Sequence, residues 1–354
     1  MKRCAGLALL LFTGCLIAAQ PPPLALKSMG VFYVGAKRVD SPYSDERDAE
    51  FPTRGRTTVS GHAKVTYFIP GKVTGPGIVL VPGFGLSSSI YLATPDSREG
   101  WAQYFVRRGY PVYVVDVPER STAGFAVDAI NGCIAADPQF GCSRESRLGR
   151  TSLEQPWRVW GFGPRFGEVH ANSRFPALPL QQNYIEQFGA SFEVYMGSAN
   201  IGRSGAGTSR SPVVDALMAL LKRVGPSVLV LHSAAGAAGF EVARQDPARV
   251  RALVSIETTV CPALQGNAGD PLAGIAFLGI YGDYVDERGS GGHPSRYRSC
   301  RSLAESPERV AAGKFIDLPG DLKVRGNSHL MMQDDNSDDI AALVSDWLAA
   351  SAIK

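Results

Sequence analysis

The chain lacks three features that would place it among membrane, nucleic-acid-binding or zinc proteins. After the first 20 residues, no stretch of about 18 uncharged apolar residues remains that could span a membrane. No block of Lys and Arg is longer than two residues and the net charge is only +3, which argues against a nucleic-acid-binding face. No two cysteines have C-x-x-C spacing, and no histidine lies at a helical ligand spacing from a cysteine, so a zinc site is not expected.

The composition itself is ordinary for a globular protein. Of the 354 residues, 45% are hydrophobic and 19% are charged, which is enough apolar material for a sizeable core. Signals for strands and helices alternate from about residue 60 to the C-terminus. Such alternation favours one large α/β domain with a mostly parallel central sheet.

The first 20 residues have the pattern of a secretory signal peptide. Lys2 and Arg3 supply the positive charge, residues 7–12 form a short apolar core, and residues 18–20 offer small side chains for cleavage. We therefore expect an exported protein, periplasmic or secreted. The sequence FTGC, which ends at Cys15, is a loose lipobox, so a lipoprotein anchored through Cys15 is the alternative.

Cysteines are few, and two of the six belong to this leader. An even number of the remainder in an oxidising compartment predicts two disulfides. The sequence alone allows three pairings. We favour Cys133–Cys142, which closes a short loop, together with Cys261–Cys300.

Two regions follow the leader. Residues 21–57 are expected to be an N-terminal extension with an edge strand near residues 30–39, and residues 58–354 to be the α/β domain. An insertion at about residues 121–205 is rich in Gly, Pro, Ser and aromatics. A structureless loop of that length would be unusual, so we interpret it as a cap over a substrate pocket. Strands are expected at residues 62–68, 77–82, 111–116, 227–232, 251–257 and 275–281, and helices at 100–109, 213–224, 234–244 and 338–350.

Ser233 lies where a buried strand turns sharply into a helix of small residues. This is the context of a nucleophile elbow, in which the turn forces a serine above the carboxyl end of the sheet in the α/β-hydrolase fold. The usual pattern is G-x-S-x-G, and Leu231 and Ala235 occupy the glycine positions here. An ordinary helix-capping serine is the competing interpretation. His232, adjacent on the strand, points to the opposite face and is expected to pack or to orient neighbouring groups.

A serine nucleophile needs a general base, which follows the serine and the acid along the chain in this fold. Two histidines follow Ser233. His293 lies in a glycine-rich stretch that we expect to be a flexible loop. His329 lies between a predicted last strand and the C-terminal helix, where the fold places its histidine, so we favour His329.

The acid that would orient the imidazole has two candidates. Glu257 and Asp283 each follow a buried strand. The later strand is the commoner position in this fold, which favours Asp283, but the residues alone leave the choice open. The other carboxylate would then be a surface or loop-capping group.

An oxyanion would be held by two backbone N–H groups. One belongs to Ala234, which follows the nucleophile and begins a helix. The second is expected in the loop after an early strand, which reads PGFG at residues 82–85. Phe84 is the first choice and Gly85 the second, because glycines let this backbone approach a substrate closely.

Several stretches together resemble a family of exported bacterial α/β-hydrolase esterases whose best-known member cleaves esters of halogenated cyclic compounds. They are TPD at residues 94–96, FGPRF at 162–166, His232-Ser233, SIE at 255–257 and GNSHLMMQD at 326–334. The match runs from about residue 30 to residue 350. In that family the acid is a glutamate after the sixth strand, so the resemblance implies Glu257 rather than Asp283, and it suggests a homodimer. The family's His-Gly-Cys-Cys oxyanion loop is replaced by PGFG here, and the insertion diverges, which puts substrate preference in doubt.

These features predict a serine carboxylic-ester hydrolase that acts on a small-molecule ester through an acyl-enzyme, without metal or cofactor. Acyl transfer, lactone hydrolysis or amide hydrolysis on the same triad is an alternative, because these reactions share the intermediate. Dehalogenation is disfavoured, since it needs a carboxylate where the chain has Ser233. A binding protein that keeps the fold without catalysis is the alternative from another class.

Overall fold

The structure is a computed structural model. It describes residues 21–40, 57–94, 96–139, 148–176, 182–196, 211–262, 272, 274–288 and 293–353. The predicted signal peptide, with Cys15, lies outside these residues. None of the helices within the described ranges combines the length and the hydrophobicity that crossing a bilayer would require.

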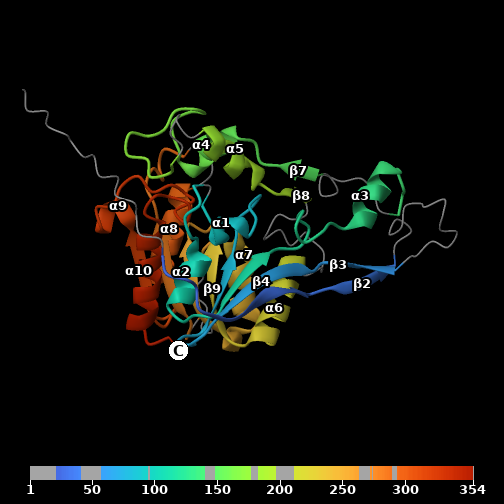
Figure 1. Ribbon diagram of the computed structural model, residues 1–354, viewed down its shortest axis with the longest axis horizontal. Coiled ribbons are helices and arrows are strands. Elements are labelled where there is room, and N and C mark those ends of the chain that lie inside the picture. Colours follow the sequence, from blue (N-terminus) through green and yellow to red (C-terminus); the bar gives the residue numbers. More distant parts are fainter. Residues whose placement is uncertain are drawn as a thin grey trace, which may run out of the picture.

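An eight-stranded, mostly parallel sheet forms the centre of the molecule (Figure 1). The strands β6, β5, β9, β10, β11 and β12 run parallel to one another, and β1 and β4 at one edge are antiparallel to their neighbours. All six residues of β9 are buried between β5 and β10, so this strand ends at the middle of the sheet. In spatial order the strands are β1 (Leu26–Val34), β4 (Ala63–Pro70), β6 (Val112–Asp116), β5 (Gly77–Val81), β9 (Ser227–His232), β10 (Val250–Ile256), β11 (Ala276–Tyr281) and β12 (Gly313–Asp317).

Helices cover both faces of this sheet because its strands are apolar on both sides. Val79 belongs to one hydrophobic core and the adjacent Leu80 to the other, as the alternation of a strand requires. On the Leu80 side lie α2 (Trp101–Arg107) and α10 (Ser337–Ala350). On the Val79 side lie α6 (Pro212–Val224), α7 (Ala235–Gln245) and α8 (His293–Ala304).

The insertion folds into short elements outside the central sheet. Figure 1 shows α4, α5, β7 and β8 together at one end of the molecule. Backbone hydrogen bonds connect the insertion to the segment before α10: His329 N–H donates to Trp160 O at 2.8 Å, and Arg174 N–H donates to Gly326 O at 2.9 Å. The elements are α3 (Val127–Ile134), β7 (Leu148–Arg150), α4 (Glu154–Trp160), α5 (Gln182–Ala190) and β8 (Val194–Met196). The remaining short elements are α1 (Ser89–Leu92), α9 (Leu318–Asp321), β2 (Lys37–Asp40), β3 (Thr57–Ser60) and the 3-10 turn η4 (Pro247–Arg249).

The predicted edge strand is present as β1, at the edge of the central sheet, but its bounds were wrong, and the prediction for His293 was also wrong. The edge strand expected at residues 30–39 is divided, because Gly35 adopts a left-handed φ of 77° and the chain turns there from β1 into β2, which pairs with β3 in a separate sheet. A Cβ on Gly35 would lie 2.9 Å from Ala216 Cα, so this turn also packs tightly against α6. His293, expected in a flexible loop, is the first residue of helix α8.

The predicted pair Cys261–Cys300 forms a disulfide, which joins the loop after β10 to α8. Cys133 is also disulfide-bonded. Cys142, its predicted partner, lies outside the described residues.

Removing the Cys261–Cys300 disulfide is expected to destabilise the protein. The bond spans 39 residues, and release of a loop of that length lowers the free energy of unfolding by about 3–4 kcal/mol in the chain-entropy account. Urea unfolding of a Cys261→Ala/Cys300→Ala variant, compared with the oxidised wild type, measures the loss. An unchanged midpoint would show that the bond does not contribute to stability.

Candidate active site

Ser233 occupies the sharp turn between β9 and α7. Its φ of 52° lies in the left-handed region that non-glycine residues rarely adopt. Two hydrogen bonds to the end of β10 and to the loop after it hold the turn: Ser233 N–H donates to Ile256 O at 3.0 Å, and Thr259 N–H donates to Ser233 O at 2.9 Å. The strained geometry expected of a nucleophile elbow is therefore present.

The large residue at the first glycine position of the elbow has a structural explanation. Leu231 points toward α7, where a Cβ on Gly239 would lie only 2.2 Å from a Leu231 methyl group. A glycine one turn into the helix thus leaves the space that a glycine in the strand would otherwise provide. Gly236 has a similar function, since a Cβ there would lie 2.5 Å from Thr258.

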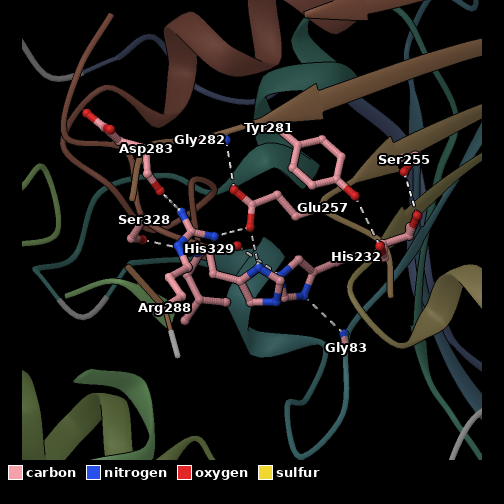
Figure 2. Close-up of polar contacts among 12 residues, drawn as sticks. Gly83, His232, Ser255, Glu257, Tyr281, Gly282, Asp283, Arg288, Ser328 and His329 are labelled. Carbon is pink, nitrogen blue, oxygen red and sulfur yellow. Dashed lines mark hydrogen bonds and ion pairs between the residues drawn. The ribbon is translucent and has the colours of Figure 1, made fainter. Parts of the chain in front are cut away.

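His329 and Glu257 lie against each other at the carboxyl ends of the strands (Figure 2). The His329 Nδ1 atom is 2.6 Å from Glu257 Oε2, and both side chains are buried. Glu257 directly follows β10 and has a left-handed φ of 45°, as Ser233 does after the adjacent β9. The two strained residues therefore follow neighbouring parallel strands.

The Glu257 carboxylate has two further donors besides the imidazole. Gly282 N–H donates to its Oε1 at 2.7 Å, and the buried Arg288 guanidinium pairs with its Oε2. Burial alone would raise the pKa of Glu257, but Arg288 and His329 outweigh burial and hold that pKa well below its usual range. Glu257 is therefore an anion when it contacts His329.

Burial lowers the pKa of His329, and the hydrogen bond to Glu257 opposes this effect only in part. The imidazole is consequently neutral at pH 7. A neutral imidazole whose Nδ1–H donates to a carboxylate has a free electron pair on Nε2, which is the state that a general base requires.

A buried polar network holds the segment that carries His329. Asp334 accepts hydrogen bonds from Ser328 N at 2.8 Å, from Ser328 Oγ at 2.8 Å and from Asn327 Nδ2 at 3.0 Å. Burial raises the pKa of Asp334 to about 7 against these three bonds, which favour the ionised form. Gln333 Nε2 donates to Ile90 O at 2.7 Å and so ties the segment to α1. The long motif at residues 326–334 is thus a self-bonded loop that positions the histidine.

Asp283, the alternative acid, has a different environment. Its Oδ2 accepts from Gly326 N at 3.0 Å and its Oδ1 from Tyr284 N at 2.9 Å. Its backbone N–H donates to Asn327 O at 2.8 Å. Asp283 therefore caps the loop that precedes His329, whereas Glu257 contacts the imidazole itself.

His232 connects the segments on either side of the elbow. Gly83 N–H donates to its Nδ1 at 3.2 Å, which leaves Nε2 as the protonated nitrogen, 3.0 Å from His329 O. The ring centroids of His232 and His329 are 4.7 Å apart. Burial lowers the pKa of His232 well below its usual value, so it is a neutral ring that orients both segments.

One cleft of about 410 Å³ contains Ser233 and His329. Ala234 and Phe84, the predicted first-choice oxyanion donors, line the same cleft, and Gly85 does not. The Phe84 ring packs on Tyr195 with centroids 4.2 Å apart. The full lining is Phe84, Arg150, Thr151, Ser152, Gln155, Val159, Trp160, Tyr195, Ser233, Ala234, Thr259, Arg296 and His329.

A buried arginine, Arg120, holds the loop that contains Phe84. Arg120 Nη1 donates to Gly83 O at 2.7 Å and to Leu86 O at 2.8 Å. Burial lowers the pKa of Arg120 to about 10, against the attraction of Glu193 and Asp116, so the side chain stays charged at pH 7. Both carbonyls point toward the guanidinium, which fixes the course of the loop next to Ser233.

Sequence reasoning missed four arginines at this site, namely Arg120, Arg150, Arg288 and Arg296. Each stands in a locally polar stretch that looks like a solvated surface, and no motif or spacing marks it. Within the described part of the chain, no three His, Cys, Asp or Glu side chains group as metal ligands would. The side chains that the structure brings together here are a serine, an imidazole, carboxylates and guanidinium groups.

Comparison with known proteins finds similarity to a lipase and to an esterase. The chain is 23% identical over 333 residues to a probable secreted lipase, phiG, of Fungal sp. (strain ATCC 74256), a match that covers 80% of the chain and 85% of the lipase. A solved structure of a novel bacterial esterase superposes with a TM-score of 0.78 at 28% identity, covering 94% of this chain and 98% of the esterase. No protein-family model matches the chain.

The order of the strands, the strained serine after β9 and the similarity to these two proteins lead to the same assignment. The chain has the α/β-hydrolase fold, and its similarity to an esterase and to a secreted lipase supports a hydrolase.

Proposed function

We propose that the protein is a serine carboxylic-ester hydrolase that acts through an acyl-enzyme. Ser233 attacks the ester carbonyl, His329 takes the serine proton and delivers it to the leaving alcohol, and Glu257 orients His329 and stabilises its cation. The observation that carries this proposal is that Ser233 and His329 line the same cleft. The Nδ1 atom of this imidazole lies 2.6 Å from Glu257 Oε2.

The electrostatics of the three residues support these roles. Burial keeps His329 neutral before reaction, so it can accept the proton from Ser233. When His329 becomes a cation, the charge of Glu257 lies within hydrogen-bonding distance. Arg288 offsets part of that negative charge, and this limits how basic His329 becomes.

Two backbone N–H groups would stabilise the oxyanion. We assign them to Ala234, at the start of α7, and to Phe84, with Gly85 as the second choice. Ala234 benefits from the positive end of an 11-residue helix. The Gly83 N–H is already donated to His232, which leaves it unavailable to a substrate. Removal of one such donor typically costs about 3–4 kcal/mol of transition-state stabilisation.

The insertion at residues 121–205 would serve as a cap. Arg150, Trp160 and Tyr195 come from this region and line the cleft beside Ser233. The Trp160 carbonyl also accepts from the His329 N–H. A cap that contributes side chains to the cleft would limit water access and select substrates.

Export is part of the proposal. The similarity to a secreted lipase and the Cys261–Cys300 disulfide support an oxidising compartment. The N-terminal pattern supports a periplasmic or secreted protein, with lipid attachment at Cys15 as the alternative.

A fluorophosphonate probe tests the proposal directly, because it reacts only with a serine that an adjacent base activates. We expect one covalent adduct per chain, which mass spectrometry of tryptic peptides would locate on Ser233. Heat-denatured protein is the matched control and should not be labelled. Absence of labelling in folded protein, or labelling of another serine, would contradict the assignment.

A further inference from the structure

The cleft beside Ser233 has an unbalanced charge. Arg150 and Arg296 both line it, and among the described residues that line it there is no Asp or Glu. Glu257, the acid behind His329, is buried and already paired with Arg288 and with the imidazole. A ligand in the cleft therefore meets positive charge that no carboxylate from the described part of the lining neutralises.

Arg150 contributes to the cleft but is held by the insertion itself. Its Nε donates to Phe192 O at 3.2 Å, and its Nη2 donates to Gly189 O at 3.1 Å and to Ala190 O at 3.3 Å. These acceptors are neutral carbonyls, so they fix the guanidinium in place without cancelling its charge.

Arg296 makes fewer polar contacts than Arg150. It lies on α8 and is partly buried, and burial lowers its pKa against the attraction of Tyr281. Within the described part of the chain, no hydrogen bond or ion pair joins Arg296 to another residue. A partly desolvated cation without a partner is costly unless an anion arrives to pair with it. Its charge also acts on His329, which places it near the reacting groups.

We propose that the cleft binds esters that carry a second, anionic group, a carboxylate, which pairs with Arg296 while Ser233 attacks the ester. This inference rests on the proposed esterase function and assigns its substrate class. A guanidinium is suited to the task, because its fork of N–H donors matches the two oxygens of a carboxylate. Arg150 would add long-range attraction, since the described residues of the lining include no opposing charge.

Matched ester pairs measure this preference. On the acyl side, monomethyl glutarate carries a carboxylate and dimethyl glutarate is its neutral counterpart. On the alcohol side, 4-acetoxybutyrate carries a carboxylate and its amide is the neutral counterpart. In at least one pair we expect kcat/KM of the charged member to exceed that of the neutral member by about 10- to 100-fold, the range of a charged hydrogen bond in a cleft. In Arg296→Gln this ratio should fall close to one.

Arg298 provides the matched control, because it stands on the same helix but lines a separate cavity. Arg298→Gln should keep the wild-type ratio. Raising the salt concentration on wild-type protein gives a second measurement that needs no variant, and it should reduce the ratio by screening the pair.

The outcomes separate this inference from the function on which it rests. Equal kcat/KM for charged and neutral members in both pairs, with both hydrolysed, would overturn the anion site and leave the esterase proposal standing. A ratio that Arg296→Gln leaves at its wild-type value would also overturn it. Failure to hydrolyse any of the four esters, together with no fluorophosphonate labelling, would overturn the esterase proposal itself.

Discussion

Ser233→Ala is expected to lower kcat by about 10⁴-fold or more while leaving the melting temperature within a few degrees of the wild type. In the proposed mechanism the hydroxyl is the attacking group, and without it only the oxyanion donors and substrate binding would remain to accelerate hydrolysis. Alanine keeps the small side chain that the tight turn at φ 52° already accommodates. Steady-state kinetics on a neutral ester and thermal unfolding by circular dichroism would measure the two effects.

The control for this prediction is Ser299→Ala, which removes a serine hydroxyl on α8 away from the cleft. Its kinetics should match those of the wild type. Retention of more than about 1% of wild-type kcat by Ser233→Ala would exclude it as the nucleophile, given the size of such effects in serine hydrolases.

Glu257→Gln is expected to lower kcat by about 10³- to 10⁴-fold, and Asp283→Asn by less than about tenfold, as for a residue that does not touch the reacting groups. A neutral amide cannot stabilise the His329 cation and can hold the imidazole in the wrong tautomer. Asp283 instead accepts from two backbone N–H groups, and an asparagine oxygen can still accept one of them.

Glu257→Gln should also weaken the fold, which gives the prediction a second readout. The change leaves the fully buried Arg288 without its anionic partner. Breaking a buried ion pair from one side typically costs about 3–5 kcal/mol. Chemical denaturation would measure this loss, and activity should be compared at a temperature where both variants are folded. A larger loss of activity for Asp283→Asn than for Glu257→Gln would show that the choice of acid is wrong.

Much of the fold could be predicted from local sequence patterns. Continuous apolar runs marked the buried strands, because a strand covered on both faces has no polar side. The structure ends these strands within a residue or two of the predicted bounds, as for residues 227–232 and β9. The prediction failed at Gly35, where a turn packs against α6, and at His293, which begins α8, a helix that packs against β11 and β12.

The departure from G-x-S-x-G shows how tertiary contacts complete a local motif. Leu231 weakens the motif when only the neighbours of Ser233 are read. In the structure, Gly239 supplies the missing space from one turn inside α7. The same close approach of strand and helix is achieved with the glycine on the other element, which a five-residue pattern does not detect.

The sequence by itself determined the alternation of strands and helices, the position of Ser233 at a strand-to-helix turn and the order of serine, acid and histidine, because each depends on neighbouring residues or on chain order alone. The neighbouring residues left the choice between Glu257 and Asp283 open, and the family resemblance implied Glu257. Only the tertiary structure places Glu257 against His329 and brings Arg288 and Arg296 into the site. Both carboxylates follow buried strands, so the register of β10 and β11 and the course of residues 326–329 select between them. The arginines lie in locally polar stretches, and their roles arise from burial that only the packed molecule creates.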